Sequence, residues 1–232
     1  MKNTKLLFAK LTDFQLLARS SKELPKPLLH AAVGQLLSDA HADKSSPTSN
    51  TRLTWSFGTG YKQYANYVGD LFNAYCNKGV YSVNVLAKKG GDSYVNYRLK
   101  TATLPIFNAL YDMFYILCPV TGKRVKIVPL NIDCLMSPIT LAHLIMGDGG
   151  YNKASNMVRI FTYNFTLEDC NRLAQSITNM NIQTQVKYDR LGKNGEKQYI
   201  LKIDGSQLKT LRDTVTPHME SSMYYRVGLS IK

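Results

Sequence analysis

Long apolar runs are absent from this 232-residue chain: no stretch reaches the length of about 18 residues that a membrane-spanning helix needs. Cysteine is scarce too, and the four cysteines lie far apart, with no CxxC pair and no Cys/His cluster at zinc spacing. We expect them to be buried, reduced thiols, because no signal peptide is apparent; two disulfides in a secreted protein are the alternative. The cysteines are Cys76, Cys118, Cys134 and Cys170.

Acidic residues are few, with 16 Asp and Glu against 29 Lys and Arg, so the net charge is +13. This excess favours a polyanionic partner, and nucleic acid is the first candidate, against the alternative of a merely basic protein. A hydrophobic content of 44% is typical of a globular chain. The length allows one large domain or two domains of about 100 to 120 residues each.

The string LAHLIMGDGGY, from Leu141 to Tyr151, predicts a helix that ends at an acid. Asp148 is followed by Gly149 and Gly150, and we expect these glycines to end the helix in the left-handed conformation. A carboxylate there faces the negative end of the helix dipole, so a positive charge should compensate it. A metal ion is the obvious candidate.

An earlier string, AAVGQLLSDAH from Ala31 to His41, repeats this pattern and ends at Asp39. Small residues recur along one side of both helices, so the two backbones could approach closely, as in small-xxx-small packing. Packed side by side, the helices would bring Asp39 and Asp148 together. The small residues are Ala31, Gly34 and Ser38 in the first helix and Ala142 and Gly147 in the second.

The two strings carry a resemblance to a known family. LAHLIMGDGG resembles the second motif, and VGQLLSDAH a degenerate first motif, of the LAGLIDADG homing endonucleases of the single-chain, organellar intron-encoded type. The resemblance covers roughly residues 28 to 229. The sequence departs from the family where Ala40 replaces a glycine, Gly147 replaces an acid and His143 replaces a small residue. We expect His143 to pack in the helix interface, since no histidine lies in a metal-ligand pattern.

After each motif helix the same elements recur: strand, helix, two strands and a further helix. One can lay VRIFTYNFTLEDCNRLAQSI over LTWSFGTGYKQYANYVGDLF with like elements aligned, which indicates an internal duplication of about 100 residues. The polar segment 43–50 between the first helix and strand is expected to be a loop. The expected elements are strand 52–58, helix 61–76, strands 81–87 and 94–102 and helix 104–117, then strand 157–163, helix 167–180, strands 182–188 and 198–204 and helix 206–215.

We therefore expect an α+β fold made of a pseudo-two-fold duplication of an αββαββα-like unit. Residues 1–27 would form an N-terminal extension containing a short helix, residues 28–129 the first half and residues 130–232 the second. Two antiparallel sheets would form a DNA-binding saddle, with the two motif helices packed at their interface. Because one polypeptide already contains both halves, we expect a monomer.

Each expected strand has one apolar and one polar face. A polar sheet face is often merely solvated, but in a chain this basic it could contact bases in the major groove while lysines neutralise phosphates. The resemblance implies the same use of the two sheets. The candidate DNA-binding residues are Arg52, Thr54, Ser56, Lys88, Lys89, Asn96, Arg98, Lys100, Arg159, Lys187, Arg190 and Lys202.

The resemblance also implies a catalytic site. Asp39 and Asp148 would bind two or three Mg2+ ions with the main-chain oxygens of Ser38 and Gly147, whereas each acid alone could be a helix cap. One basic residue per half would complete the site. These are Lys126, with Lys123 as its alternative, and Arg226, although either could simply contact phosphate.

The implied function is site-specific, Mg2+-dependent hydrolysis of both strands of a long double-stranded DNA target. The alternative is an RNA maturase that binds its host intron and assists splicing, with or without cleavage. A non-catalytic DNA-binding repressor would leave both acids unexplained. The resemblance further implies a mitochondrial location, and we expect neither a membrane partner nor a small-molecule cofactor.

Overall fold

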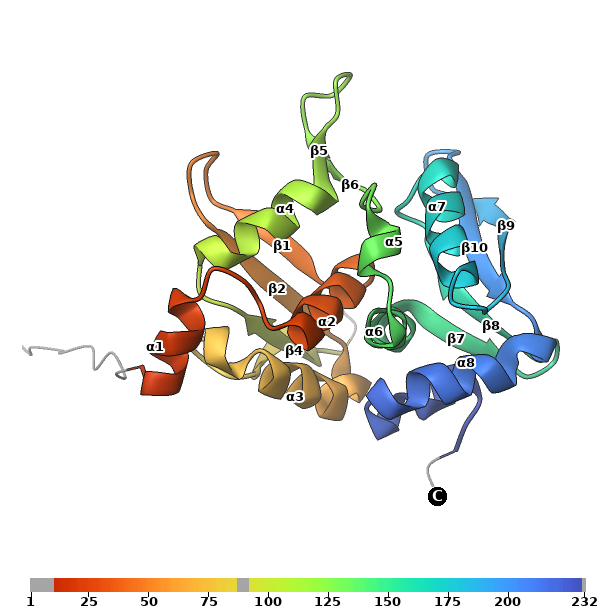
Figure 1. The fold of residues 1–232 in the computed structure, drawn as a ribbon, viewed down its shortest axis with the longest axis horizontal. Helices are drawn as coiled ribbons and strands as arrows, with labels where there is room; N and C mark the ends of the chain where they lie inside the picture. The colour runs from red at the N-terminus through yellow and green to blue at the C-terminus, as the bar shows by residue number, and fades with distance from the viewer. Residues whose placement is uncertain (1–10, 87–91, 231–232) are drawn as a thin grey trace, which may run out of the picture.

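The computed structural model describes residues 11–86 and 92–230 and contains two four-stranded antiparallel sheets with the same internal order. One sheet has the order β1-β2-β4-β3 and the other β7-β8-β10-β9. Helices α2 and α6 lie side by side between the sheets, α3 and α4 border the first sheet, and α7 and α8 border the second (Figure 1). The expected α+β duplication is confirmed.

The first half begins at the first motif helix and ends in a small hairpin. Its core faces are the buried alternate residues of β2 and one side of α3. Its elements are α2 (Lys26–Leu37), β1 (His41–Lys44), β2 (Thr51–Phe57), α3 (Lys62–Leu71), β3 (Tyr81–Val85), β4 (Tyr94–Lys100), α4 (Asn108–Phe114), β5 (Tyr115–Leu117) and β6 (Arg124–Lys126).

The second half repeats this order, with the short helix α5 before its motif helix and the 3-10 segment η6 in place of the hairpin. Thr166 caps α7 in a capping box with Asp169, which fixes where that helix begins. Its elements are α5 (Ile132–Leu135), α6 (Pro138–Asp148), β7 (Gly149–Asn152), β8 (Met157–Phe161), α7 (Leu167–Thr178), β9 (Thr184–Leu191), β10 (Lys197–Ile203), α8 (Leu208–Val215) and the 3-10 segment η6 (Ser221–Val227).

Strand register matches the alignment of the two repeated strings. Thr54 pairs with Lys100 between β2 and β4, and Arg159 pairs with Lys202 between β8 and β10. In the alignment of the two strings, Thr54 is equivalent to Arg159. Their strand partners, Lys100 and Lys202, are therefore equivalent too. Positions on one sheet therefore have defined equivalents on the other.

Helices α2 and α6 approach so closely that two glycines become necessary. A Cβ at Gly34 would lie 2.6 Å from the Cβ of His143, and a Cβ at Gly147 would lie 2.5 Å from the Cβ of Ser38. The offset of 109 residues between Asp39 and Asp148 makes His143 the equivalent of Gly34. The bulky histidine fits because its counterpart has no side chain, and the expected close approach of the helices is confirmed.

A buried polar network joins this interface to the first sheet. Gln35 is fully buried; its Nε2 donates to the Tyr64 hydroxyl at 2.7 Å and lies 2.9 Å from His143 Nδ1, while its Oε1 accepts from Trp55 Nε1 at 2.9 Å. The His143 ring also stacks on Tyr67. His143 is thus a packed interface residue, as expected, and the satisfied network fixes the contact between α2, α6 and β2.

Three expectations about local structure are wrong. Segment 43–50 is not entirely loop, because its first two residues belong to β1, which pairs with β2. Gly149 is extended, with φ −82° and ψ 161°, and begins β7 rather than taking a left-handed conformation. The predicted helix 104–117 ends at Phe114, since Tyr115–Leu117 pairs with Arg124–Lys126 as a hairpin.

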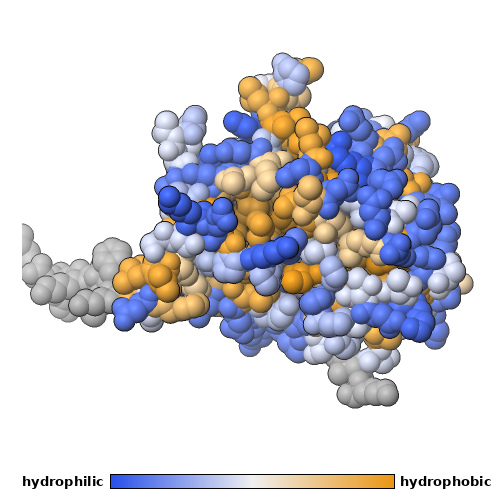
Figure 2. Space-filling view, in the orientation of Figure 1, coloured by the Kyte–Doolittle hydropathy of each residue, from blue (hydrophilic) through white to orange (hydrophobic). Residues whose placement is uncertain are grey.

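The expected N-terminal helix is present as α1 (Asp13–Ser20), capped by Thr12. All four cysteines are free, but only Cys76 and Cys170 are buried; Cys134 is exposed and Cys118 intermediate, which corrects the prediction for these two. In the described residues no helix is long and apolar enough to cross a membrane. Figure 2 shows apolar residues over the centre of one face, over α1 and over the projecting β5–β6 hairpin.

A first prediction concerns oligomeric state. Because two equivalent sheets and both motif helices come from one polypeptide, the 26.1 kDa chain should sediment as a monomer without DNA. Analytical ultracentrifugation at micromolar concentration measures this. A compact particle of about twice that mass would contradict it.

A second prediction uses the buried imidazole. Burial lowers the pKa of His143 to about 3, against about 6.5 in the unfolded chain. Between about pH 6.5 and pH 3 the unfolded chain binds a proton at His143 and the folded protein does not. The free energy of unfolding therefore decreases as the pH falls below 6.5. The free energy of unfolding should fall by about 1 kcal/mol more per pH unit in the wild type than in His143→Gln. Urea unfolding between pH 6.5 and 4.5 measures this, and parallel curves would contradict it.

Candidate active site

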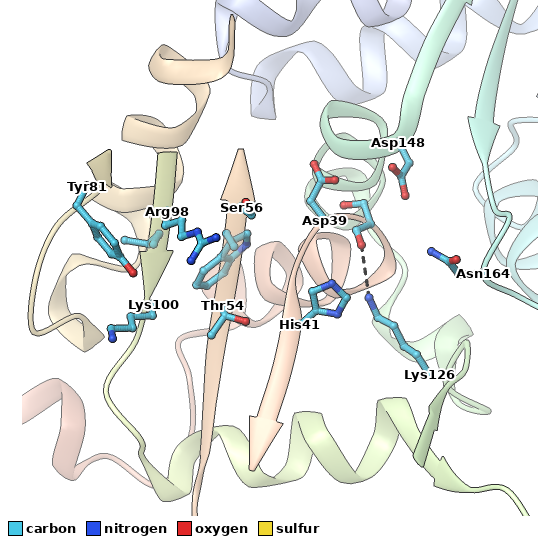
Figure 3. A pocket seen from close by; sticks show the side chains of 13 residues that line it. Asp39, His41, Thr54, Ser56, Tyr81, Arg98, Lys100, Lys126, Asp148 and Asn164 are labelled. Carbon is cyan, nitrogen blue, oxygen red and sulfur yellow. Dashed lines mark hydrogen bonds between the residues drawn. The ribbon is translucent and has the colours of Figure 1, made fainter. Parts of the chain in front are cut away.

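Asp39 and Asp148 come together where the two motif helices end. Asp148 is the last residue of α6, and Asp39 lies two residues beyond the end of α2. Both line a cavity of about 660 Å3 that opens beside the first sheet (Figure 3). Asp39 also adjoins Gly147, where an added Cβ would lie 3.2 Å from Asp39 Oδ2. The expected meeting of the two acids is therefore present in the fold.

The environment of these acids disfavours their charged forms. Burial, together with the negative charge of Asp39, raises the pKa of Asp148 to about 7. Burial also raises the pKa of Asp39, opposed by Arg226 and Lys126. Two desolvated carboxylates in one cavity repel each other, so the site favours protons or cations.

Lys126 supplies one positive charge from β6. Its Nζ donates to the carbonyl of Ser38 at 3.4 Å (Figure 3) and to that of Ala40 at 2.9 Å. Burial lowers the pKa of Lys126 to about 8, opposed by Asp148 and then Asp39. Lys123 is exposed in the hairpin turn. Lys126, rather than Lys123, therefore lies at the acids.

Arg226 supplies the second charge from η6. Its guanidinium donates to the carbonyl of Gly149 and, through Nη2 at 3.2 Å, to the Tyr61 hydroxyl. Together with Asp39 and Gly147 it lines a smaller cavity of about 180 Å3. Among the opposing charges, Arg226 is the stronger influence on Asp39 and Lys126 the stronger on Asp148. Each half thus contributes the cation that acts most on the acid of the other half.

These residues fit a divalent cation that prefers oxygen ligands. The two carboxylates and the Ser38 carbonyl, which faces Lys126, are hard oxygen donors. The described residues contain no cluster of three or more His, Cys, Asp or Glu side chains able to hold a metal. Protein ligands alone would leave the coordination incomplete, so water or phosphate oxygens would have to complete it, as Mg2+ commonly requires.

The candidate DNA-binding residues of the first half follow β2 and β4. Thr54 pairs with Lys100 and Ser56 with Arg98, and all four side chains line the large cavity. The Nε of Arg52 lies 3.9 Å from Oδ2 of Asp43, so this carboxylate partly neutralises its charge. Asn96 lies on β4 opposite Val83 and does not line this cavity. Lys88 and Lys89 lie outside the described residues.

In the second half the candidates lie on β8, β9 and β10. Arg159 and Lys202 are directly opposite each other, an unfavourable pairing of like charges unless an anion lies nearby. Lys202 is bridged to Asp204 at 2.7 Å, whereas Arg190 lies 3.5 Å from Asp189 and stacks over Tyr163. Lys187 is exposed on β9. The second sheet therefore carries much of its positive charge in partly compensated form.

Sequence reasoning missed four residues around the acids. His41, Tyr81 and Asn164 line the large cavity (Figure 3). Tyr61 lines the small cavity, and its hydroxyl accepts a hydrogen bond from Arg226. The alternation of exposed His41 with buried Ala42 is the signal that could have identified β1. Asn164 follows β8 in a turn, and no local pattern marks it.

Comparison with known proteins finds relatives named as mRNA maturases and as an intron-encoded endonuclease. The chain is 27% identical over 210 residues to cytochrome b mRNA maturase bI2 of Debaryomyces hansenii, covering 90% of this chain and 76% of the relative. It is 26% identical to the protein of the same name from Saccharomyces cerevisiae, covering 87% of this chain but only 47% of that protein's length. It is 29% identical to the intron-encoded endonuclease ai4 of Dictyostelium discoideum, covering 68% and 94%.

Solved structures share the fold. The homing endonuclease I-WcaI, bound to its DNA recognition sequence, aligns with a TM-score of 0.78 and 18% identity over 94% of this chain and 92% of that one. A form of I-DmoI, in complex with nicked target DNA in the presence of manganese, aligns with a TM-score of 0.51 and 14% identity over 84% and 98%. The sequence model of the LAGLIDADG DNA endonuclease family matches residues 29–211, and the chain therefore belongs to that family, as its two motif strings predict.

Proposed function

We propose that this protein is a metal-dependent endonuclease that cuts both strands of a specific double-stranded DNA site. The observation that carries the proposal is the meeting of Asp39 and Asp148, from equivalent helices, between two basic sheets. Family membership and the DNA-bound state of I-WcaI support it. Residues 28–129 and 130–232 would act as two halves, each bound to one half of the target.

The two sheets would hold the duplex while the acids face the scissile phosphates. Polar side chains on β2 and β4 would contact base edges in the major groove, and the lysines and arginines of both sheets would neutralise phosphates. Lys126 and Arg226 would bring positive charge to the phosphates next to the acids. These hydrogen-bonded cations are already in position, so little reorganisation is needed when the anion arrives.

Mg2+ is the proposed cofactor, held by Asp39 and Asp148 with main-chain oxygens of Ser38 and Gly147. When bound, it would activate a water molecule as nucleophile and stabilise negative charge on the phosphate. The presence of manganese with the I-DmoI complex supports a divalent ion. In the absence of a cation, burial raises the pKa of both carboxylates and so disfavours their charged forms. A bound cation would stabilise those charged forms.

RNA maturation is the second candidate function. It is favoured by the names of the Debaryomyces and Saccharomyces relatives, both cytochrome b mRNA maturases. Retention of both acids favours cleavage, and the two activities are compatible in one chain. The cytochrome b message named for the two maturases also supports our proposal of a mitochondrial location.

Replacing either acid separates cleavage from binding. Asp39→Asn and Asp148→Asn remove a negative metal ligand while keeping side-chain size, so cleavage should fall by at least about a hundredfold. Affinity should persist, because it comes from phosphate and base contacts spread over both sheets. Cleavage with Mg2+ and gel-shift affinity without it should be measured on the same target, which selection from a random library can provide.

The matched control is Asp213→Asn, which makes the same charge change on an exposed residue of α8, far along the chain from the motifs. It should cut at the wild-type rate. An Asp148→Asn protein that also cuts both strands at that rate would refute the metal assignment. Loss of binding and of folding together would instead indicate that the aspartate is a structural cap.

Electrostatic binding should be strongly dependent on salt. In a plot of log affinity against log salt concentration, each phosphate contact contributes about −0.9 to the slope. Several contacts together should therefore lower the affinity by orders of magnitude between about 50 and 200 mM salt. Lys100→Ala should weaken binding and reduce the slope by about 1. Lys209→Ala, an exposed residue of α8 paired with Asp213, is the control and should leave the slope unchanged. Affinity that is flat with salt would contradict the proposed role of the basic sheets.

A further inference from the structure

At one equivalent position the two sheets present opposite chemistry. Ser56 pairs with Arg98 on the first sheet, and the equivalent pair on the second sheet is Phe161 with Ile200. These residues occupy the same face as Thr54 and Arg159 respectively, the face proposed to contact DNA, because side chains alternate along a strand. The duplication therefore conserved the frame but replaced a polar pair with an apolar pair.

Phe161 and Ile200 do not belong to the main core. Their strand neighbours Ile160 and Leu201 are completely buried and face the helices, so the pair lies on the opposite side of the sheet. Phe161 is only partly buried, whereas Ile200 is 6% exposed. The Phe161 ring lies over Gly150, where an added Cβ would be 3.4 Å from Cε2.

The apolar pair is extended by an aromatic ring and bordered by basic side chains, of which Lys202 and Arg190 are partly compensated by Asp204 and Asp189. The rings of Phe161 and Tyr163 are 5.6 Å apart, and the Arg190 guanidinium lies 4.4 Å from the Tyr163 ring centre. Arg159 and Lys202 flank the pair along their strands, and Lys187 pairs directly with Ile200 on the other side. An apolar surface bordered by cations suits an apolar group carried on a polyanion.

In the major groove that group is the C5-methyl of thymine, which apolar side chains contact directly. We propose that Phe161, supported by Ile200, selects a thymine in the half of the target bound by the second sheet, through its methyl group. Arg98 at the equivalent position of the first sheet would instead select guanine by donating to O6 and N7. The inference rests on the proposed function and adds that the target is not palindromic at this position.

Arg98 is available for such a contact. No hydrogen bond or ion pair within the described part of the chain engages its guanidinium, and it lines the large cavity with Lys100 and Tyr81 (Figure 3). The competing explanation for Phe161 and Ile200 is that the cross-strand apolar pair merely stabilises the sheet. Under that explanation, replacing Phe161 would lower stability without changing which base is preferred.

The test uses the whole chain and measures binding, so it does not depend on cleavage. A target is first selected from a random duplex library in the presence of Ca2+. Each thymine of the selected site is then replaced singly by deoxyuridine, which removes only the methyl group. For each protein variant, the affinity for the thymine duplex is divided by the affinity for the uracil duplex. This ratio cancels any loss of folded protein.

For the wild type, one thymine in a single half of the site should give a ratio of about three to five, the effect of one buried methyl group. Phe161→Ser should reduce the ratio to about one, whereas Phe161→Leu should keep most of it. Repeating the selection with Ile200→Arg should replace that thymine by guanine. Arg98→Ala should change the preference only in the other half.

Two outcomes would overturn the inference. One is equal wild-type affinity for thymine and uracil at every position of the selected site. The other is a ratio that persists in Phe161→Ser. Failure of the wild type to select any duplex sequence would instead contradict the proposed function itself, so the two failures are distinguishable.

Discussion

The close approach of α2 and α6 is the constraint on which the rest of the structure depends. Gly34 admits His143, and Gly147 admits Ser38, so the two helix ends lie near enough to place Asp39 and Asp148 in one cavity. Packing at this distance tolerates no added carbon without a shift of the backbone, because protein interiors are close-packed. The same contact sets the separation of the two sheets, since β7 follows α6 directly and β1 follows α2 after three residues.

That packing creates an electrostatic conflict that the fold resolves only in part. Burial raises the pKa of both acids, while Lys126 and Arg226, one from each half, oppose the shift. The lysine is itself destabilised by burial, as its lowered pKa indicates. An apolar replacement of these groups would relieve the conflict. Their presence together is therefore better explained by a ligand of mixed charge, a cation with a phosphate, than by stability.

The pattern of apolar and polar residues predicted the elements in which the two faces alternate clearly. Strand β2, with Leu53, Trp55 and Phe57 buried, is an example. The pattern failed where tertiary pairing decides the conformation. Tyr115–Leu117 continues a helical pattern but forms a strand because Arg124–Lys126 pairs with it. Gly149 looks like a helix stop, yet its extended backbone packs against Ile145 and enters a sheet. Similarly, nothing near Tyr61 in the sequence indicates its contact with Arg226, 165 residues away.

The duplication also shows which positions could diverge. Gly34 and His143 are in contact, so a larger residue at position 34 would require a smaller one at position 143. Substitutions at these two positions are therefore coupled. Arg98 pairs with Ser56 in the first sheet and Ile200 pairs with Phe161 in the second, so each could change without a compensating change in the other. The asymmetric duplex target that we propose would require such independence on the sheet faces that contact bases. The two halves should therefore remain most alike in backbone and at the helix contact, and differ most on the polar sheet faces.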